Sequence, residues 1–255
     1  MRELRCRNAR TRAMAGVAAA LLTAPILLSG AHTALASGTP WTVVRSSNMT
    51  IPGGQLKSVS CSSPDACTAV GTHLNRRGIN VTLAERWNGS TWQRQSTPNP
   101  AVDTTPTIRP SLTGVSCPAS NLCLAVGTYQ AGFPAAIAEE WNGSRWRMLA
   151  FPVPAGSFGT TLDQVSCTSV SFCEAAGSFE VNGATLPLAE RWNGSAWLLQ
   201  QTPRPPISLG DSTVAFTAVS CASRTFCEAW GGGNGGSPGP TVAERWNGTS
   251  WHLQA

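Results

Sequence analysis

The stretch that decides the fold is Val165-Ser166-Cys167, followed by Cys173-Glu174-Ala175-Ala176-Gly177 and then by Ala189-Glu190-Arg191-Trp192-Asn193-Gly194-Ser195-Ala196-Trp197. Close relatives of these three pieces recur in the same order in four units of the chain. The first cysteines of successive units are 56, 50 and 54 residues apart. Such a fixed period is the signature of a repeat architecture, in which each unit is one supersecondary element that packs on its neighbours.

Each unit predicts four short strands. In the first unit they run over residues 56–61, 67–72 and 81–87, and from 92 toward 97. The Asn-Gly between the third and fourth strands predicts a two-residue type I′ turn, in which both central residues take positive φ. In that register Trp87 faces Ser90 and Glu85 faces Trp92, so that both tryptophans project from one face of the sheet.

A four-stranded antiparallel sheet about every 50 residues, with large apolar side chains repeating on one face, is typical of a propeller blade. We therefore predict an all-β fold, a small β-propeller of four four-stranded blades within residues 37–255. The repeats lie approximately at 54–97, 110–151, 160–202 and 214–255. Residues 41–47 begin like a fourth strand, and we expect them to close the ring as an additional strand, because an open array leaves unpaired edges. The alternative is that the chain is part of a longer array.

The pattern V-S-C-x5-C-x-A-V-G followed by A-E-R-W-N-G-x-x-W resembles the repeats of secreted actinobacterial proteins of unknown function, which are regarded as β-propeller-like. They are distantly similar to kelch and sialidase-type repeats. The resemblance covers essentially all of residues 37–255 and implies the fold and an extracellular location, but no established activity. Glu140 in place of arginine and Trp230 in place of a small residue are minor departures.

The first 36 residues read as a signal peptide that is removed. Five arginines precede an apolar stretch, and Ala34-Leu35-Ala36 gives a small-x-small cleavage site. The whole chain has 18 basic and 13 acidic residues, a net charge of +5. Five of these basic residues and one acidic residue lie in the signal peptide, so the remainder carries about +1 and gives little support to nucleic-acid binding. We expect a secreted, extracellular protein with no membrane span after cleavage.

The eight remaining cysteines predict one disulfide per blade. Two cysteines flanking five residues face each other across a hairpin, and an exported chain reaches an oxidising compartment. Zinc pairs have shorter spacing and no histidine accompanies these cysteines, so we expect no metal site and no cofactor. The predicted bonds are Cys61–Cys67, Cys117–Cys123, Cys167–Cys173 and Cys221–Cys227.

Several recurring residues are predicted to serve the scaffold. A glutamate at one position in every repeat (Glu85 is the first) packs a blade, whereas catalytic carboxyl pairs come from dissimilar positions. The neighbouring arginines pair with these glutamates or lie on the opposite face. Tryptophans repeated this regularly favour packing between blades over sugar stacking. Four of the six N-x-S/T triplets coincide with the Asn-Gly hairpins and are explained by turn chemistry rather than glycosylation.

Catalytic motifs are missing from the sequence. After the signal peptide the histidines are His73 and His252, and neither a G-x-S-x-G elbow nor an H-E-x-x-H motif occurs. Tyr129 is the sole tyrosine, which excludes the two-tyrosine chemistry of kelch-type copper oxidases. The sialidase box is also missing. The sequence does not exclude catalysis, but it favours a protein without enzymatic activity.

Candidate ligand-binding residues come from the variable stretches between the second and third strands, because repeat proteins vary the loops of one rim. Trp230 was included because it occurs in one unit only, beside the glycine-rich stretch 231–240. The candidates are Trp230, Tyr129, Phe133, Phe179, His73, Arg76 and Arg77. We expect a monomeric, non-catalytic binding propeller whose ligand is a glycan or a protein. The alternatives are a hydrolase or lyase of extracellular polysaccharide and a purely structural role.

Overall fold

The computed structural model describes residues 43–46, 53–100, 109–203, 213–233 and 241–254. The predicted signal peptide over 1–36 lies outside these ranges, and so do residues 41, 42 and 47 of the predicted closing strand. Residues 43–46 have no strand conformation, and the Ser46 hydroxyl donates a hydrogen bond to the Glu85 carboxylate of the first repeat. Closure of the ring by residues 41–47 stays a prediction.

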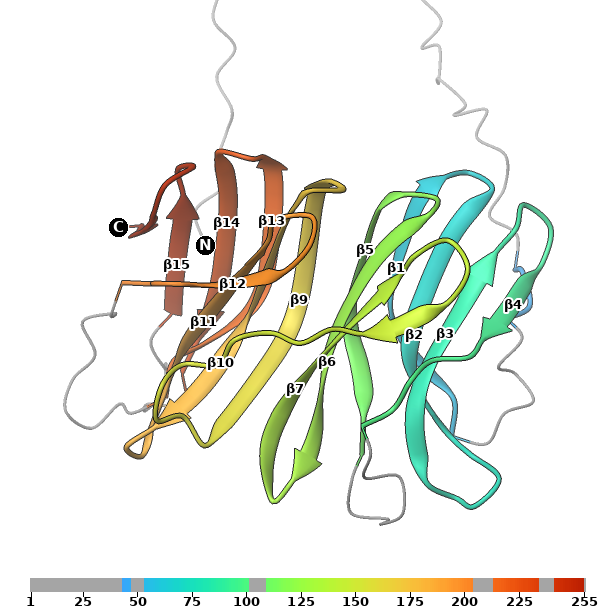
Figure 1. Cartoon of the computed structure of the whole chain (residues 1–255), viewed down its shortest axis with the longest axis horizontal. Helices are drawn as coiled ribbons and strands as arrows, with labels where there is room; N and C mark the ends of the chain where they lie inside the picture. Colours follow the sequence, from blue (N-terminus) through green and yellow to red (C-terminus); the bar gives the residue numbers. More distant parts are fainter. Residues whose placement is uncertain (1–42, 47–52, 101–108, 204–212, 234–240, 255) are drawn as a thin grey trace, which may run out of the picture. The chain divides into compact units, whose positions relative to one another are not determined.

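The described part of the chain forms four separate four-stranded antiparallel sheets, one per repeat (Figure 1). Within each sheet the strands lie side by side in chain order. This confirms the predicted all-β fold of four propeller blades. The blades are β1 (Gln55–Ser63), β2 (Ala66–Leu74), β3 (Asn80–Trp87) and β4 (Trp92–Gln95); β5 (Ser111–Ala119), β6 (Leu122–Ala131), β7 (Phe133–Trp141) and β8 (Trp146–Met148); β9 (Gly159–Ser169), β10 (Phe172–Val181), β11 (Ala184–Trp192) and β12 (Trp197–Gln200); β13 (Ala215–Ser223), β14 (Phe226–Gly232), β15 (Thr241–Trp246) and β16 (Trp251–Leu253).

A disulfide joins the first two strands of every blade, as predicted. Its two cysteines have Cα atoms 3.9–4.0 Å apart, and in the first, third and fourth blades they are direct cross-strand partners. The four bonds are Cys61–Cys67, Cys117–Cys123, Cys167–Cys173 and Cys221–Cys227. Each bond therefore fixes one hairpin within a blade and crosses no blade boundary.

The glycine that ends the A-V-G motif is required by close backbone approach. A Cβ on Gly177 would lie 2.1 Å from the carbonyl oxygen of Thr161 on the neighbouring strand β9, and the equivalent glycines have the same clash. The pairing of β9 with β10 shifts register beside this glycine. The repeated glycine thus permits an irregularity in the first hairpin of every blade.

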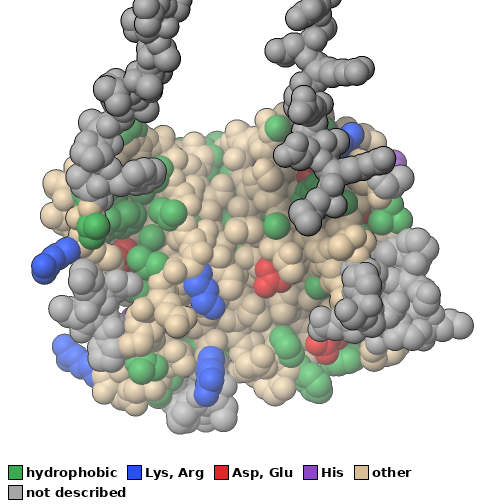
Figure 2. All heavy atoms as spheres, turned by 180° about the vertical axis from the view of Figure 1, so that it is seen from behind, with side chains coloured by type: hydrophobic (Ala, Val, Ile, Leu, Met, Phe, Trp, Pro, Cys, Tyr) green, Lys and Arg blue, Asp and Glu red, His purple; other side chains and the backbone are tan. Residues whose placement is uncertain are grey.

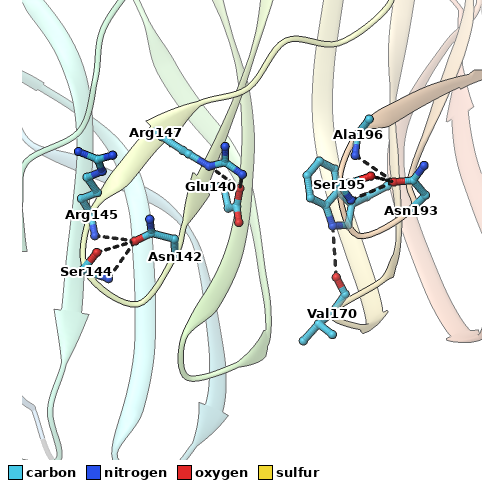
Figure 3. A network of polar contacts seen from close by, with 10 residues as sticks. Glu140, Asn142, Ser144, Arg145, Arg147, Val170, Asn193, Ser195 and Ala196 are labelled. Carbon is cyan, nitrogen blue, oxygen red and sulfur yellow. Dashed lines mark hydrogen bonds and ion pairs between the residues drawn. The ribbon is translucent and has the colours of Figure 1, made fainter.

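The predicted type I′ turn is wrong. Trp192 pairs directly with Trp197, so four residues form the loop, and only Gly194 has positive φ. The Asn193 side-chain oxygen accepts bonds from the Ser195 backbone N–H, the Ser195 hydroxyl and the Ala196 N–H, each 2.9 Å long (Figure 3). This side-chain cap holds the longer loop and explains why a hydroxyl residue follows Asn-Gly.

Each blade has two unlike faces. One, which we call the tryptophan face, carries both hairpin tryptophans and the repeated glutamate. The opposite one, the alanine face, carries the alanine that precedes this glutamate. The tryptophan face of each blade packs on the alanine face of the blade before it. The three cores formed in this way join the first and second, second and third, and third and fourth blades.

The strands that begin the blades make the main contacts between sheets. β1 packs on β5, β5 on β9, and β9 on β13, which places these first strands on the inside of the array. Trp192 and Trp197 have 1% and 3% of their surfaces exposed, and the tryptophans of the second and fourth blades are also buried. Packing between blades is thus confirmed as the role of these tryptophans.

Candidate functional site

The two ends of the blades differ in what they can bind. Because the strands alternate in direction, the disulfide turns and the Asn-Gly turns lie together at one end. The loops that join second to third strands lie at the other end with the linkers between blades, and we call this end the variable rim. The turn end is repetitive, whereas the variable rim differs from blade to blade, so a specific site belongs on the variable rim.

Three predicted site residues occupy one structural position. His73, Tyr129 and Phe179 each lie six residues after the second cysteine of a blade, near the rim ends of β2, β6 and β10. Each is partly buried on the tryptophan face. Arg76 and Arg77 are exposed in the loop after β2, where Asn75 accepts a hydrogen bond from the Arg77 backbone N–H. The structure thus brings the predicted residues to equivalent places, on separate blades.

A pocket of about 400 Å³ opens on the variable rim at the third blade. We call it the rim pocket. Phe179, Leu186 and Leu188 come from β10 and β11, whereas Pro154 and Ala155 come from the linker that leads into the blade. The wall is completed by Val181, Pro187, Leu199, Gln200, Gln201, Thr202 and Pro203. Its lining is mostly apolar, with amide and hydroxyl groups at one side and no charged side chain among these twelve residues.

Some polar groups of the rim pocket already form hydrogen bonds within the protein. The Gln200 side-chain oxygen accepts a 2.8 Å bond from the indole N–H of Trp251 on the fourth blade. The Thr202 hydroxyl donates to the carbonyl oxygen of Pro187. Gln201 is exposed and makes no side-chain hydrogen bond with the described residues. It is the group best placed to meet a polar ligand atom.

The linker into the third blade is held against β10. The Phe158 N–H donates to the Glu180 carbonyl oxygen, and Pro154 accepts bonds from both the backbone and the hydroxyl of Ser157. Phe158 also meets Phe133, at the start of β7 in the second blade, edge to face with ring centroids 5.2 Å apart. Both rings remain about half exposed, at 56% for Phe133 and 44% for Phe158. Phe158 lies on the linker that supplies one wall of the rim pocket, and Phe133 reaches it from the second blade.

A second pocket, of about 410 Å³, lies at the equivalent place in the first blade. His73 replaces Phe179 there, and Arg94 replaces Leu199. The two pockets therefore share a position and differ in charge. Repetition of the scaffold with variation of the lining is the pattern expected of a binding rim.

Trp230 does not lie on the variable rim. It is in the middle of β14, between Ala218 and Ala243, on the alanine face of the fourth blade. The equivalent residues of the other blades, Val70, Val126 and Ala176, are buried between blades. Trp230 has 56% of its surface exposed because the described residues place no further blade on this face. Its predicted role in ligand binding stays a prediction, and the structure separates it from the other candidates.

Three of the four repeated glutamates, Glu139, Glu190 and Glu244, lie buried between blades, as predicted for scaffold residues. Glu85 is buried on the tryptophan face of the first blade, where Ser46 contacts it. Burial raises the pKa of Glu139, Glu190 and Glu244 to about 8, so that these carboxyls are protonated at neutral pH. Burial also raises the pKa of Glu174 to about 9, although Arg191 lowers it in part. Each repeated glutamate occupies a different blade, and none lines the rim pocket.

Arginines of the alanine face pack on aromatic rings of the next blade. The Arg86 guanidinium lies 5.4 Å from the ring centroid of Trp141, and Arg191 lies 5.5 Å from that of Trp246. This confirms the prediction that places the arginines on the face opposite the glutamates. On the surface seen in Figure 2 the basic side chains stand singly among polar and apolar ones. No basic track for a nucleic acid is visible on that surface.

Sequence reasoning missed the linker residues of the site, namely Pro154, Phe158 and Gln201. They lie outside the repeated motifs, and so the comparison of units gave them no position. A usable signal was present in Phe151-Pro152-Val153-Pro154, a proline-rich apolar segment between two blades. Such a segment is too apolar for an ordinary solvated linker.

Comparison with solved structures finds lectins whose chains are partly similar in structure to this one. The SapL1 lectin in complex with α-methyl fucoside matches with a TM-score of 0.50 and 11% identity, over 78% of this chain and 63% of the lectin chain. The six-bladed β-propeller lectin of Aleuria aurantia matches with a TM-score of 0.46 and 10% identity, again over 78% and 63%. The chain thus spans somewhat under two thirds of each lectin. No protein-family model matches the sequence, and neither does any curated protein.

The described residues contain no helix long and apolar enough to span a membrane. Four disulfides stabilise the blades. Disulfides persist in oxidising environments such as the cell exterior.

Proposed function

We propose that the protein is an extracellular carbohydrate-binding propeller that holds a neutral saccharide in the rim pocket. The observation that carries the proposal is the lining of this pocket. Phe179 and the leucines offer an apolar surface, and Gln201 and Thr202 add polar groups beside it. Ligand pockets combine such walls with a few polar groups that fix orientation.

The lining favours an uncharged ligand. A sugar ring has apolar C–H faces that stack on aromatic and aliphatic side chains, and hydroxyls that bond to amides. An acidic saccharide or a phosphate would need a cationic partner, and the lining of the rim pocket has none. The exposed pair of Phe133 and Phe158 offers a longer chain a second apolar contact beyond the pocket.

Binding is favoured over hydrolysis by the same lining. Glycosidases place two carboxyl groups about 5–10 Å apart across the scissile bond. The rim pocket is lined by no carboxylate, and the buried glutamates are held between blades. An extracellular location is supported by the disulfides and by the signal-like sequence at residues 1–36.

The test is calorimetric titration of the purified protein with neutral methyl glycosides, α-methyl fucoside among them, and with neutral polysaccharides. We expect saturable binding that Phe179→Ala weakens about fivefold, because loss of the aromatic contact costs about 1 kcal/mol. Phe226→Ala, at an exposed phenylalanine of the fourth blade that lines neither pocket, is the matched control and should leave this binding unchanged.

Two results would overturn the proposal. Binding that survives Phe179→Ala and Gln201→Ala at full affinity would place the ligand elsewhere. Release of reducing sugar from a polysaccharide, assayed in the same samples, would make the protein a hydrolase, which is the second candidate.

A further inference from the structure

The two end faces of the four-blade array are unlike and complementary. The first blade presents its tryptophan face, where Val59 is 60% exposed, although its equivalents Val115, Val165 and Val219 are at most 7% exposed. The fourth blade presents its alanine face, with Trp230 at 56% exposure. Figure 1 shows these two blades at opposite ends of the row of sheets. Inside the chain, every tryptophan face is covered by an alanine face.

The first recurring contact between blades joins the inner strands. The Ser60 hydroxyl accepts a hydrogen bond from the backbone N–H of Cys117, 2.9 Å away. Ser116 accepts in the same way from Cys167, and Ser166 from Cys221, both at 3.0 Å. At the two ends of the array, one donor and one acceptor of this kind have no partner in a neighbouring blade that the structure describes. They are the hydroxyl of Ser220 on the fourth blade and the N–H of Cys61 on the first, and both residues are exposed.

The second recurring contact joins the outer strands. The indole N–H of Trp146 donates to the side-chain oxygen of Gln95, and that of Trp251 donates to Gln200, both at 2.8 Å. Gln254 follows Trp251 by three residues, as Gln95 follows Trp92. The unmatched halves are thus the indole of Trp92 on the first blade and the amide of Gln254 on the fourth. Neither has the corresponding bond within the described residues.

The third recurring contact places an arginine over a tryptophan, as Arg86 lies over Trp141 and Arg191 over Trp246. The equivalent arginine of the fourth blade is Arg245, which is left on the end face, paired with Glu228 and lying over Phe226. The equivalent ring of the first blade is Trp87, which is only partly buried.

We propose that a second copy of this chain docks head to tail, with the alanine face of its fourth blade against the tryptophan face of the first, where it takes the place that Ser46 holds over Glu85. Each of the three kinds of contact between blades has one partner unused on the alanine face of the fourth blade and the other partner unused on the tryptophan face of the first. The end face of one copy therefore offers the partners that the end face of another copy lacks. In this arrangement Ser220 meets Cys61, Gln254 meets Trp92 and Arg245 lies over Trp87. Trp230 covers Leu56 and Val59, as Val70 covers Leu112 and Val115 within the chain.

Two copies joined in this way at both ends form a closed dimer with two identical contacts. A head-to-tail contact that does not close would instead continue into an open chain. Closure leaves neither the exposed tryptophan nor the exposed valine in water. This arrangement replaces the monomer expected from the sequence, because it uses end faces that the sequence did not reveal.

The experiment uses two exposed residues whose substitution spares the interior of the blades. Trp230→Asp disables the alanine end face, and Val59→Asp disables the tryptophan end face. Light scattering coupled to size exclusion should give a dimer for the wild-type protein and half that mass for each variant. Val170→Asp, an exposed valine on a disulfide turn, is the matched control and should remain a dimer. Unchanged melting temperatures would show that the variants are folded.

Mixing the two variants tests the direction of docking. One contact in the mixed pair joins two unaltered faces, so an equimolar mixture should regain a dimer that neither variant forms. A wild-type protein that is monomeric would overturn the proposal. So would a dimer broken by Trp230→Asp and not by Val59→Asp, since tail-to-tail pairing needs only the first face, and so would a mixture that stays monomeric.

Discussion

The Ser60 hydroxyl accepts the backbone N–H of Cys117 across the boundary between the first and second blades. The same pair recurs at the next two boundaries, between the serine and the cysteine of the V-S-C motif in consecutive repeats. A tripeptide that looks like part of one blade therefore also joins that blade to the next. In the first three units the serine thus supplies an acceptor to a backbone donor of the next inner strand, which would otherwise need one.

Removing one of these serines should therefore loosen a blade boundary. Ser116→Ala leaves the N–H of Cys167 without its acceptor, and we expect a loss of about 1–3 kcal/mol in the free energy of unfolding. Ser120→Ala, an exposed serine in the adjacent turn, should cost less than about 0.5 kcal/mol. Urea unfolding followed by tryptophan fluorescence measures both. Equal stability of the two variants would show that the bond across the boundary has no net effect.

Stability should fall as pH rises, because the buried glutamates have raised pKa values. The folded-state pKa of Glu139 and Glu190 is about 8, against an ordinary value of 4.5. Between these pH values the folded chain binds more protons than the unfolded chain, so stability is full below about pH 4.5 and declines up to about pH 8. Thermal unfolding from pH 4.5 to 9 should show a falling melting temperature.

Glutamine keeps the shape of the protonated carboxyl and does not titrate. Glu139→Gln should therefore reduce the slope of melting temperature against pH, with its largest stabilisation near pH 8 to 9. Glu180→Gln, on the variable rim, is the control for loss of a carboxyl outside the blade boundaries. A wild-type melting temperature that rises over this range would contradict the burial of uncharged carboxyls.

The Asn-Gly turns should depend on the asparagine oxygen. Asn193→Ala removes three hydrogen bonds from the loop, and we expect a loss of about 1–3 kcal/mol. Asn193→Asp keeps an acceptor at the same place and should cost less than half as much. Both are measured by thermal unfolding. If the alanine and aspartate variants proved equally stable, the turn would be held by Gly194 and the strands rather than by the cap.

The sequence predicts the structure of each blade, but it does not predict which blade faces are left uncovered at the two ends of the array. Spacing of Cys167, Cys173, Trp192 and Trp197 predicts strands, disulfide and packing face, because each serves a contact that repeats. The turn register was wrong because Asn-Gly can begin a four-residue loop as well as fill a two-residue one, and the following Ser195 decides between them. Trp230 was assigned to a loop site because a motif does not tell whether another blade covers the face on which a residue lies.

Only part of the proposed site follows from the sequence. Phe179 and Phe133 follow from the variable stretches within repeats, whereas Phe158 and Pro154 lie in a linker without a repeat position. Bringing them together requires the packing of one blade on the next, which is a property of the folded chain. Comparison of the repeats finds residues within one blade, and it does not find walls made by the linkers that join blades.

The outer strands give the last prediction. Gln95 of the first blade accepts the indole N–H of Trp146, whereas the second blade has Leu149 at the equivalent place, opposite Trp197 of the third blade. The indole nitrogen of Trp197 is buried and has no hydrogen-bond partner among the described residues. Gln95→Leu would give Trp146 the same deficit, and we expect a loss of about 1–3 kcal/mol, since an unsatisfied buried donor has this cost.

Gln93→Leu is the matched control, because Gln93 is exposed two residues away on the same strand β4. It should change the free energy of unfolding by less than about 0.5 kcal/mol. The converse variant, Leu149→Gln, offers Trp197 an acceptor and exchanges apolar contact for a hydrogen bond. In the Gln95→Leu background Leu149→Gln should have the effect that it has in the wild-type protein, because the two boundaries share no contact at these residues. Coupling between the two substitutions would mean that the blade boundaries do not act independently.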